Sequence, residues 1–514
     1  MIVKRSRKKL IVPTLAVLTL SLAASAWAQG SHDGHRDHRD ALGSRFEATH
    51  DEPRLHPRHG VDSVRHWNEI ALIANALDHT PVAPGEKRIF GEQLGPCRTS
   101  RALAIVHIAI FDTVNAIAGG YKSYTGLSSA HDETSMDAAI AQAAHDTLVA
   151  LFPSQRASFD ERLDEDLGRI GDHREKRNGI HLGRRAAAAI LALRANDGSQ
   201  HAEPRVGIEY ITSGEPGRWR QDPISLIPLA LGALWGGVRP FVLQSANQFR
   251  APPPPALNSE EYAAAFHEVK RLGGDGVITP TERSAEQTTI GIYWGYDGTP
   301  GLGTPPRLYN QIVVEIADQR GSDAVEVARL LAHVNVAMAD TCIAVWESKY
   351  FYDFWRPVTG IREADQGTGP TGAGDGNPAT VGDPTYTPLG APASNFKVPT
   401  PDFTPPFPAY PSGHAGFGGA LFRILRKFYK TDDIAFTFVS DEFNGVTRDN
   451  DGTVRPLVPR SFSSFSEAKE ENGQSRIYLG IHWAFDKTEG IAQGRQVADY
   501  VYDNAFERLR RPRP

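Results

Sequence analysis

Residues 322–355 have the sequence SDAVEVARLLAHVNVAMADTCIAVWESKYFYDFW. The apolar residues recur at helical spacing, and the stretch predicts one long helix or a pair of helices. Upstream, five more stretches carry apolar residues three and four positions apart and predict further helices: 64–77, 100–117, 136–152, 154–170 and 176–195. The alternation typical of strands is scarce. The sequence therefore predicts an all-α protein.

Turn and cap residues predict the remaining elements. Asn258 with Glu261 is typical of a helix cap, and Thr279 to Glu282 (TPTE) predicts a second helix that runs to about residue 297. Helices are expected again at 412–429, at 463–479 and from about 482. Between them, residues 366–411 contain 18 Gly or Pro among 46 positions, which predicts a long irregular loop of the kind that often carries function.

The predicted helices suggest two helix bundles joined by long Pro/Gly-rich loops. An N-terminal bundle with its Pro-rich connection is expected over 61–257, and a C-terminal bundle over 258–514. Residues 1–28 have a basic start, an apolar run over 10–24 and small residues at Ala26 and Ala28, which is typical of a secretory signal peptide. Residues 29–60 are polar and predict a flexible leader. The mature protein is therefore expected to be exported, periplasmic or secreted, with no later stretch apolar and long enough to span a membrane.

Charge and cysteine content exclude several classes of protein. The chain has 55 Lys and Arg against 61 Asp and Glu, and five of the basic residues lie in the first 28. The acidic remainder argues against nucleic acid as a partner. Cys97 and Cys342 are the two cysteines, so a disulfide-dense scaffold and a cysteine-based metal finger are excluded. Two buried free thiols are favoured over one disulfide.

Three separated segments contain the residues that are suited to binding or catalysis. They are Lys349 to Pro357 (Lys-x6-Arg-Pro), Pro411 to His414 (Pro-Ser-Gly-His) and Ser475 to Asp486 (Ser-Arg-x3-Gly-x-His-x3-Asp). The three cations among them would need a multiply charged oxyanion to offset their repulsion if they cluster. A helix that begins at Ser-Gly presents free backbone N–H groups to an anion. These segments together predict a pocket for an oxyanion of phosphate size.

The two histidines and the last acid of these segments extend the prediction. One histidine could attack or ligate the central atom of the oxyanion, and the other could move a proton. Asp486 lies four residues after His482, so on a helix it could hold that ring through Nδ1 and leave Nε2 free.

In this order, the segments resemble the signature of the type-2 phosphatidic acid phosphatase superfamily, which includes soluble acid phosphatases, membrane lipid phosphatases and vanadium-dependent haloperoxidases. The resemblance is closer to haloperoxidases of the chloroperoxidase type. It rests on 407–414 (FPAYPSGH), on 296–310 (YDGTPGLGTPPRLYN) and on the helix around 346–355. It extends from about residue 287 to 486 and is weaker over 61–125.

This resemblance implies a vanadate cofactor and a role for each matching residue. Hydrogen bonds to the vanadate oxygens are expected from Lys349, Arg356, Ser412, Gly413 and Arg476. His482 is expected to bind vanadium, and His414 to act as the acid–base residue. Asp297 is expected to pair with the site arginines and Asp486 to support the site from behind. Trp346 and Phe407 match aromatic residues beside the halide region, with plain core packing as the alternative for Trp346.

The function implied is that of a vanadate-dependent haloperoxidase. Such an enzyme oxidises halide with hydrogen peroxide to hypohalous acid, which halogenates small organic acceptors. Bromoperoxidases of the family carry a second histidine at the position of Phe407, so this chain resembles the chloroperoxidase type, although the preferred halide stays open. A homodimer is also compatible with the resemblance. The alternative is an exported acid phosphatase in which His482 attacks phosphorus; the chain length and the aromatic positions favour the haloperoxidase.

Overall fold

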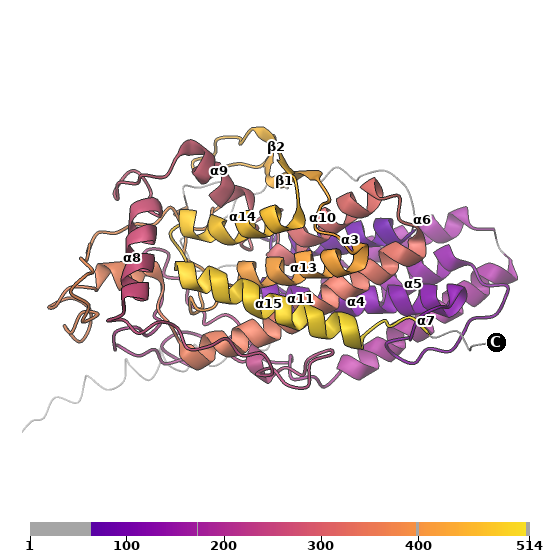
Figure 1. Cartoon of the computed structure of the whole chain (residues 1–514). Helices are drawn as coiled ribbons and strands as arrows, with labels where there is room; N and C mark the ends of the chain where they lie inside the picture. Colours follow the sequence, from indigo (N-terminus) through magenta and orange to yellow (C-terminus); the bar gives the residue numbers. More distant parts are fainter. Residues whose placement is uncertain (1–62, 172, 397–399, 510–514) are drawn as a thin grey trace, which may run out of the picture. The chain divides into compact units, whose positions relative to one another are not determined.

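The computed structural model describes residues 63–171, 173–396 and 400–509. The predicted signal peptide and polar leader lie outside these residues. The described residues all belong to a compact unit that includes 37–514. Within them the chain forms thirteen α-helices and a single two-stranded sheet, so the prediction of an all-α fold is confirmed (Figure 1).

The first helices agree with the predicted ones to within a few residues, except that α4 begins five residues earlier than expected. In chain order they are α3 (Ser63–Asp78), α4 (Gly95–Ala118), α5 (Met136–Leu151), α6 (Arg156–Arg169) and α7 (Arg174–Arg194), with short 3-10 turns η1 (Pro153–Gln155) and η2 (Trp235–Gly237). The later elements are α8 (Glu260–Leu272), α9 (Ala285–Tyr293), α10 (Pro305–Gln319), α11 (Ala324–Tyr352), α12 (Pro357–Arg362), α13 (Gly413–Tyr429), β1 (Phe436–Asn444), β2 (Leu457–Phe462), α14 (Phe465–Tyr478) and α15 (Ala484–Asn504).

Helix α11 lies in the middle of the packed helices. It contacts α4, α10, α13 and α15 and is buried along most of its length (Figure 1). Asp323 begins it with a capping box to Glu326, and Asp353 ends it in the left-handed conformation with φ 52°. The sequence left open one helix or two, and the structure shows one. Helices α4 and α11 lie on opposite sides of the predicted 257/258 boundary and pack against each other. The division into two bundles stays a prediction.

Two helices have the length and composition of membrane spans. They are α4 and α11, and the most apolar parts of both are largely buried inside the protein. By length and composition alone, the expectation that no stretch after the predicted signal peptide could span a membrane is therefore wrong. Their burial among other helices is what the core helix of a bundle requires, because such a helix is apolar on every side.

Glycines bring α13 and α15 into backbone contact. A side chain at Gly490 would lie 2.5 Å from the Ser412 carbonyl oxygen, and one at Gly494 would overlap the Gly416 carbonyl. These glycines allow the two helices to approach more closely than larger residues permit. Because both helices begin at the same end, the Pro-Ser-Gly-His segment lies beside the first turn of α15. The backbone N–H of Ser412 donates to the Asp486 carbonyl at 2.9 Å.

Two predicted helix starts are wrong. Thr279 does not begin a helix; α9 begins at Ala285, where Ser284 and Gln287 form a capping box, and it ends at Tyr293 rather than near 297. The Thr279 hydroxyl instead accepts from the Thr387 N–H of the long loop at 2.7 Å, a tertiary contact that overrides the local cap signal. At the preceding helix the cap is Ser259, which accepts from Tyr262 N, and not Asn258.

Several elements escaped prediction. Helix α10 begins within the Gly/Pro-rich run 298–306, which is typical of a loop. The last two prolines of that run, Pro305 and Pro306, occupy the first helical turn, where proline is tolerated. The hairpin of β1 and β2 consists of short strands, one of them with an alternating burial pattern. In the described part of 366–411 there is no helix or extended strand, as the Gly and Pro content predicted.

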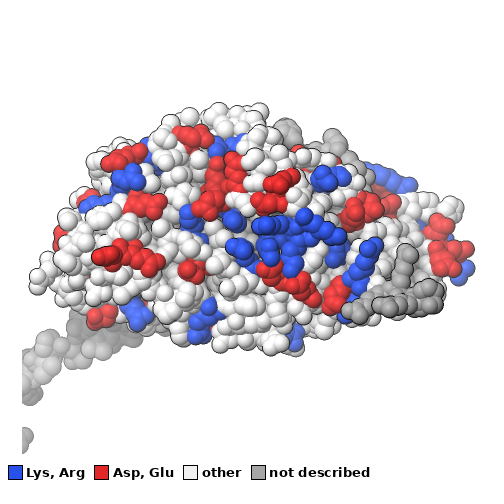
Figure 2. All heavy atoms as spheres, in the orientation of Figure 1, with Lys and Arg blue, Asp and Glu red and all other residues white. Residues whose placement is uncertain are grey.

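Basic side chains gather on the face formed by α13, α14 and α15 (Figure 2). There, Arg423, Arg426, Lys469 and Arg495 border a shallow surface depression together with Asp432. Acidic side chains surround this face in the same view. The net negative charge of the chain therefore does not exclude a local positive surface.

Candidate active site

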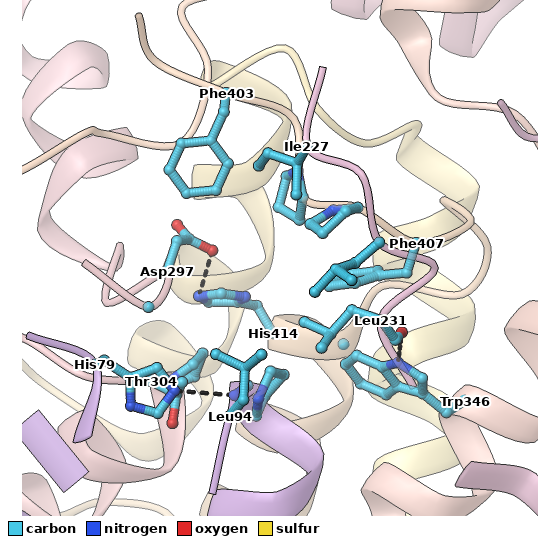
Figure 3. A pocket seen from close by; sticks show the side chains of 18 of the residues that line it. His79, Leu94, Ile227, Leu231, Asp297, Thr304, Trp346, Phe403, Phe407 and His414 are labelled. Carbon is cyan, nitrogen blue, oxygen red and sulfur yellow. Dashed lines mark hydrogen bonds and ion pairs between the residues drawn. The ribbon is translucent and has the colours of Figure 1, made fainter. Parts of the chain in front are cut away.

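A cavity brings together residues from both halves of the chain (Figure 3). About 770 Å³ of empty space lies between its walls, including the open mouth. Of the residues predicted from the sequence, those that line it are Asp297, Trp346, Phe407, Gly413, His414, Arg476 and His482. In Figure 3 the His414 ring lies near the centre, with Asp297 on one side and Phe407 and Trp346 on the other.

Arg476 is held by Asp297. Its Nη2 donates to both carboxylate oxygens of Asp297, at 2.7 and 2.9 Å, although the two residues are 179 positions apart. Both side chains are nearly inaccessible to solvent. The Nε and Nη1 atoms of Arg476 are buried and have no hydrogen-bond partner among the described residues. Buried donors are normally paired, so these two nitrogens are available to donate to a bound acceptor.

Two contacts fix the tautomer of His482. Its Nδ1 lies 2.7 Å from Asp486 Oδ2, and Arg356 Nη1 lies 3.0 Å from its Nε2. Because a guanidinium only donates, Nε2 is the acceptor and Nδ1 carries the proton. Burial, together with the positive charge of Arg356, holds the pKa of His482 well below its usual range. The neutral ring therefore presents the lone pair of Nε2.

His414 has the opposite tautomer. Its Nε2 lies 2.9 Å from the Gly295 carbonyl oxygen, which can only accept, so Nε2 carries the proton and Nδ1 the lone pair. Burial, followed by the nearby Arg476, lowers the pKa of His414 to about 4. Asp297 Oδ1 lies 3.8 Å from Nε2 and partly offsets this effect. At neutral pH the ring is an unprotonated base at the cavity wall.

Lys349 and Arg356 lie behind the aromatic wall. Lys349 Nζ donates to the carbonyls of Pro408 and Ala409, both at 2.8 Å. Arg356 donates from Nε to the Phe407 carbonyl at 2.9 Å and from Nη1 to the Ile481 carbonyl at 2.8 Å. The irregular loop thus turns its carbonyl groups toward both cations.

Burial affects the charge of both groups. It lowers the pKa of Arg356 to about 9, and burial with the charge of Arg356 holds the pKa of Lys349 well below its usual range. A buried anion near these cations would favour their charged forms, and they would in turn stabilise the anion.

The start of α13 supplies backbone donors. Ser412 is its N-cap, and its Oγ accepts from the Ala415 N–H at 3.4 Å. Gly413 follows in the first turn, where N–H groups have no acceptor within the helix. A side chain on Gly413 would lie 3.0 Å from the Trp346 ring. The glycine therefore leaves room for that indole at the cavity wall.

Trp346 and Phe407 form an apolar wall. Their ring centroids lie 4.9 Å apart. Trp346 Nε1 donates to the Leu231 carbonyl at 3.0 Å, which fixes the indole against the segment before η2. Lys349 Nζ lies 5.1 Å and Arg356 Cζ 4.9 Å from the Phe407 ring centroid, so both cations stack on the wall from behind.

Four predicted residues do not line the cavity: Lys349, Arg356, Ser412 and Asp486. They contact residues that do, through the interactions given above. Sequence reasoning missed much of the wall, which comes from other parts of the chain: His79, Phe90, Leu94, Ile227, Leu229, Leu231, Thr304, Phe403, Pro405, Pro406 and Phe417. The segment 227–231 lies within a Gly/Pro-rich region without helical periodicity, so nothing in the sequence pointed to it.

Taken together, the fold and this cavity define an all-α protein with a buried, positively charged site for an oxyanion of phosphate size. Arg476 pairs with Asp297, Lys349 and Arg356 lie behind the wall, and two neutral histidines have opposite tautomers. Such groups are suited to binding an oxyanion and to transferring a proton.

Comparison with known proteins agrees with this description. Residues 329–511 match the family model for the second helical-bundle domain of VCPO. Vanadium chloroperoxidase of Curvularia inaequalis is 32% identical, over 85% of this chain and 80% of that protein. The chain belongs to the vanadium chloroperoxidase family.

Solved structures share the fold. A bacterial vanadium-dependent iodoperoxidase aligns with a TM-score of 0.67 at 23% identity, over 87% of this chain and 98% of that chain. The holo form of a bacterial vanadium-dependent chloroperoxidase aligns with a TM-score of 0.58 at 17% identity, over 85% of this chain and 97% of that chain. The fold therefore spans relatives named for different halides.

Proposed function

We propose that this chain is a vanadate-dependent haloperoxidase. It converts halide, hydrogen peroxide and one proton to hypohalous acid and water, and the hypohalous acid halogenates small organic acceptors. The observation that carries the proposal is that two buried nitrogens of Arg476, Nε and Nη1, have no partner among the described residues and lie in the same cavity as the neutral His482 ring. Membership of the vanadium chloroperoxidase family supports the same conclusion.

The donors around the cavity fit vanadate, which is a phosphate-sized oxyanion. Arg476 and the backbone N–H of Gly413 line the cavity and would bind its oxygens. Arg356 and Lys349 lie behind the wall, and together with the Ser412 hydroxyl they are proposed to complete the set of donors. His482 would bind vanadium through Nε2, since Nδ1 already donates to Asp486; the Arg356 N–H that Nε2 accepts in this structure would then be released to an oxygen of the anion. When bound, vanadate supplies an electrophilic centre that activates peroxide without a change in metal oxidation state.

His414 is the proposed acid–base residue. Its unprotonated Nδ1 can take a proton from incoming hydrogen peroxide at neutral pH, because its pKa is lowered to about 4. The Nε2–H bond to Gly295 holds the ring in one orientation while this happens. Asp297 lies close enough to stabilise the positive charge that the ring gains.

The apolar wall is proposed to shape the halide region. Trp346 and Phe407 exclude water from one side of the cavity, and Lys349 and Arg356 behind Phe407 give that side a positive potential. This combination favours a weakly hydrated anion. Halogenation assays with chloride, bromide and iodide identify the preferred halide.

Halogenation of monochlorodimedone or phenol red tests the function. The purified chain is assayed with hydrogen peroxide and chloride, bromide or iodide, with and without orthovanadate, and with phosphate as competitor. We expect activity that requires vanadate and falls as phosphate rises. Absence of halogenation with every halide, combined with vanadate-sensitive hydrolysis of p-nitrophenyl phosphate, would contradict the proposal and identify a phosphatase.

Export and assembly are further parts of the proposal. The basic, apolar and small-residue order of residues 1–28 supports cleavage after Ala28. N-terminal sequencing of the protein from the periplasm or medium is expected to begin at Gln29, and an intact Met1 would refute export by cleavage. The proposed homodimer rests on the family resemblance, and light scattering of the purified chain tests it.

A further inference from the structure

The two cysteines of the chain meet in the core. Cys97 lies in the first turn of α4 and Cys342 in the middle of α11, 245 positions later, and their Sγ atoms are 2.7 Å apart. Both thiols are free in the structure and buried, with 4% and 0% of their surface exposed. The two side chains therefore point directly at each other across the α4–α11 contact.

The pair adjoins the candidate active site. Gly95 and Pro96, the two residues before Cys97, line the cavity. Cys342 lies one helical turn before Trp346 and two turns before Lys349, on the helix that carries both. A bond between the sulfurs would tie the first turn of α4 to the helix that positions the apolar wall.

We propose that Cys97 and Cys342 are an oxidisable pair, which hydrogen peroxide closes to a disulfide that cross-links α4 to α11 beside the active site. The choice of hydrogen peroxide as the natural oxidant rests on the proposed function. Formation of the disulfide does not itself require haloperoxidase activity. This assigns the pair to one disulfide, where the sequence favoured two free thiols.

The chemistry balances with peroxide as the co-reactant. One thiolate attacks peroxide, the O–O bond breaks, and a sulfenic acid (S–OH) and water are formed. The second thiol then attacks that sulfur, the S–S bond forms, and a second water leaves. Two thiols and one hydrogen peroxide thus give one disulfide and two waters, with the sulfurs oxidised and the peroxide oxygens reduced.

Burial sets the rate of the first step. It raises the pKa of the Cys97 thiol well above its usual range, so little thiolate is present at neutral pH. The closure should therefore be slow in the folded protein and accelerate at higher pH. The neighbouring sulfur is already in place, so the sulfenic acid should be captured before it is oxidised further.

Intact mass measurement tests the proposal directly. The full chain is purified without vanadate or halide, reduced, freed of reductant and treated with a small excess of hydrogen peroxide at pH 8. We expect a loss of about 2 Da and a peptide pair joining residues 97 and 342 in a non-reducing digest. An unchanged mass, or gain of oxygen without the joined peptides, would overturn it. Because no halogenation is measured, this result is independent of the proposed function.

Thermal unfolding supplies a second readout with matched variants. Closure of so long a loop is expected to raise Tm by about 5 °C in the wild-type chain. Cys97→Ser and Cys342→Ala each remove one sulfur, so peroxide should leave their Tm unchanged. A peroxide-dependent rise of the same size in either variant would contradict the cross-link.

Discussion

At His482, the position of one proton decides which ring atom could bind vanadium in the proposed site. Asp486 accepts from Nδ1 at 2.7 Å and also from the Trp483 N–H at 3.0 Å, so the carboxylate is fixed by the backbone that precedes α15. Burial raises the pKa of Asp486 to about 7. Within this coupled pair we place the proton on His482 Nδ1, because Arg356 occupies Nε2 as a donor.

Removing the carboxylate should therefore weaken vanadate binding. Asp486→Ala is expected to lower vanadate affinity by about 10- to 100-fold, because the ring loses both its orientation and its tautomer. Equilibrium dialysis with vanadium analysis measures the affinity. His482→Ala should abolish stoichiometric binding, and retention of such binding would refute the role of His482 as a ligand. Asp486→Asn keeps an acceptor for Nδ1 and should lose less than the alanine variant.

His414 should affect turnover far more than cofactor binding. His414→Ala is expected to lower kcat for halide oxidation by about 100- to 10,000-fold, because the base is lost. Vanadate affinity should change by less than about 10-fold, since the remaining donors stay in place. Steady-state kinetics and dialysis on the same preparation separate the two quantities. Equal losses in both would exclude an acid–base role.

At the scale of elements, the cavity depends on close contact between a loop and a helix. Gly232, just before η2, has φ +77°, and any side chain there would overlap the Trp346 indole of α11. The same loop holds that indole through the Leu231 carbonyl. The apolar wall is thus set by a helix residue and a loop backbone that are more than a hundred positions apart.

Gly232→Ala should disturb this wall. The added methyl group must displace Trp346 or the loop, and the left-handed φ adds strain, so we expect a loss of about 1–3 kcal/mol in stability. The control is Gly237→Ala in η2, where the added group would meet nothing within 4 Å and no left-handed φ is required. Thermal unfolding and tryptophan fluorescence compare the two. Equal Tm values would contradict the role given to Gly232.

At the scale of the whole molecule, buried histidines make the fold sensitive to acid. Neither ring nitrogen of His107, in α4, has a hydrogen-bond partner within the part of the chain that the structure describes, and burial lowers its pKa to about 3. His79 is buried too, with a pKa lowered to about 4. In the unfolded chain these rings bind a proton near pH 6.5, whereas in the folded chain they do not. Stability is therefore lost as the pH falls from about 6.5 toward 4.

His107→Leu should weaken that dependence. Each such histidine lowers the free energy of unfolding by up to about 1.4 kcal/mol for each pH unit below 6.5, and leucine at position 107 removes one of these losses. We expect the difference in Tm between pH 7 and pH 5 to be smaller in the variant than in the wild type. An unchanged difference would show that His107 takes up its proton in the folded state.

Most helices, the irregular loop and the residues of the candidate site could be predicted from the sequence alone. These features depend on short-range rules: apolar periodicity, the exclusion of helix by Gly and Pro, and the four-residue spacing that sets Asp486 against His482. Local rules failed at α9 and α10, where a tertiary contact of Thr279 and two prolines in the first turn of α10 contradicted the simplest interpretation.

Only the tertiary structure decided how distant residues meet. The Asp297–Arg476 pair, the contribution of 227–231 to the cavity and the approach of Cys97 to Cys342 join positions more than a hundred residues apart. No local spacing encodes such contacts, because they follow from how α4, α11, α13 and α15 pack, and that packing depends on side-chain volumes summed over the whole core. The sequence therefore predicts which groups would bind an oxyanion, whereas the packing of the helices brings them to one cavity or to its supporting wall.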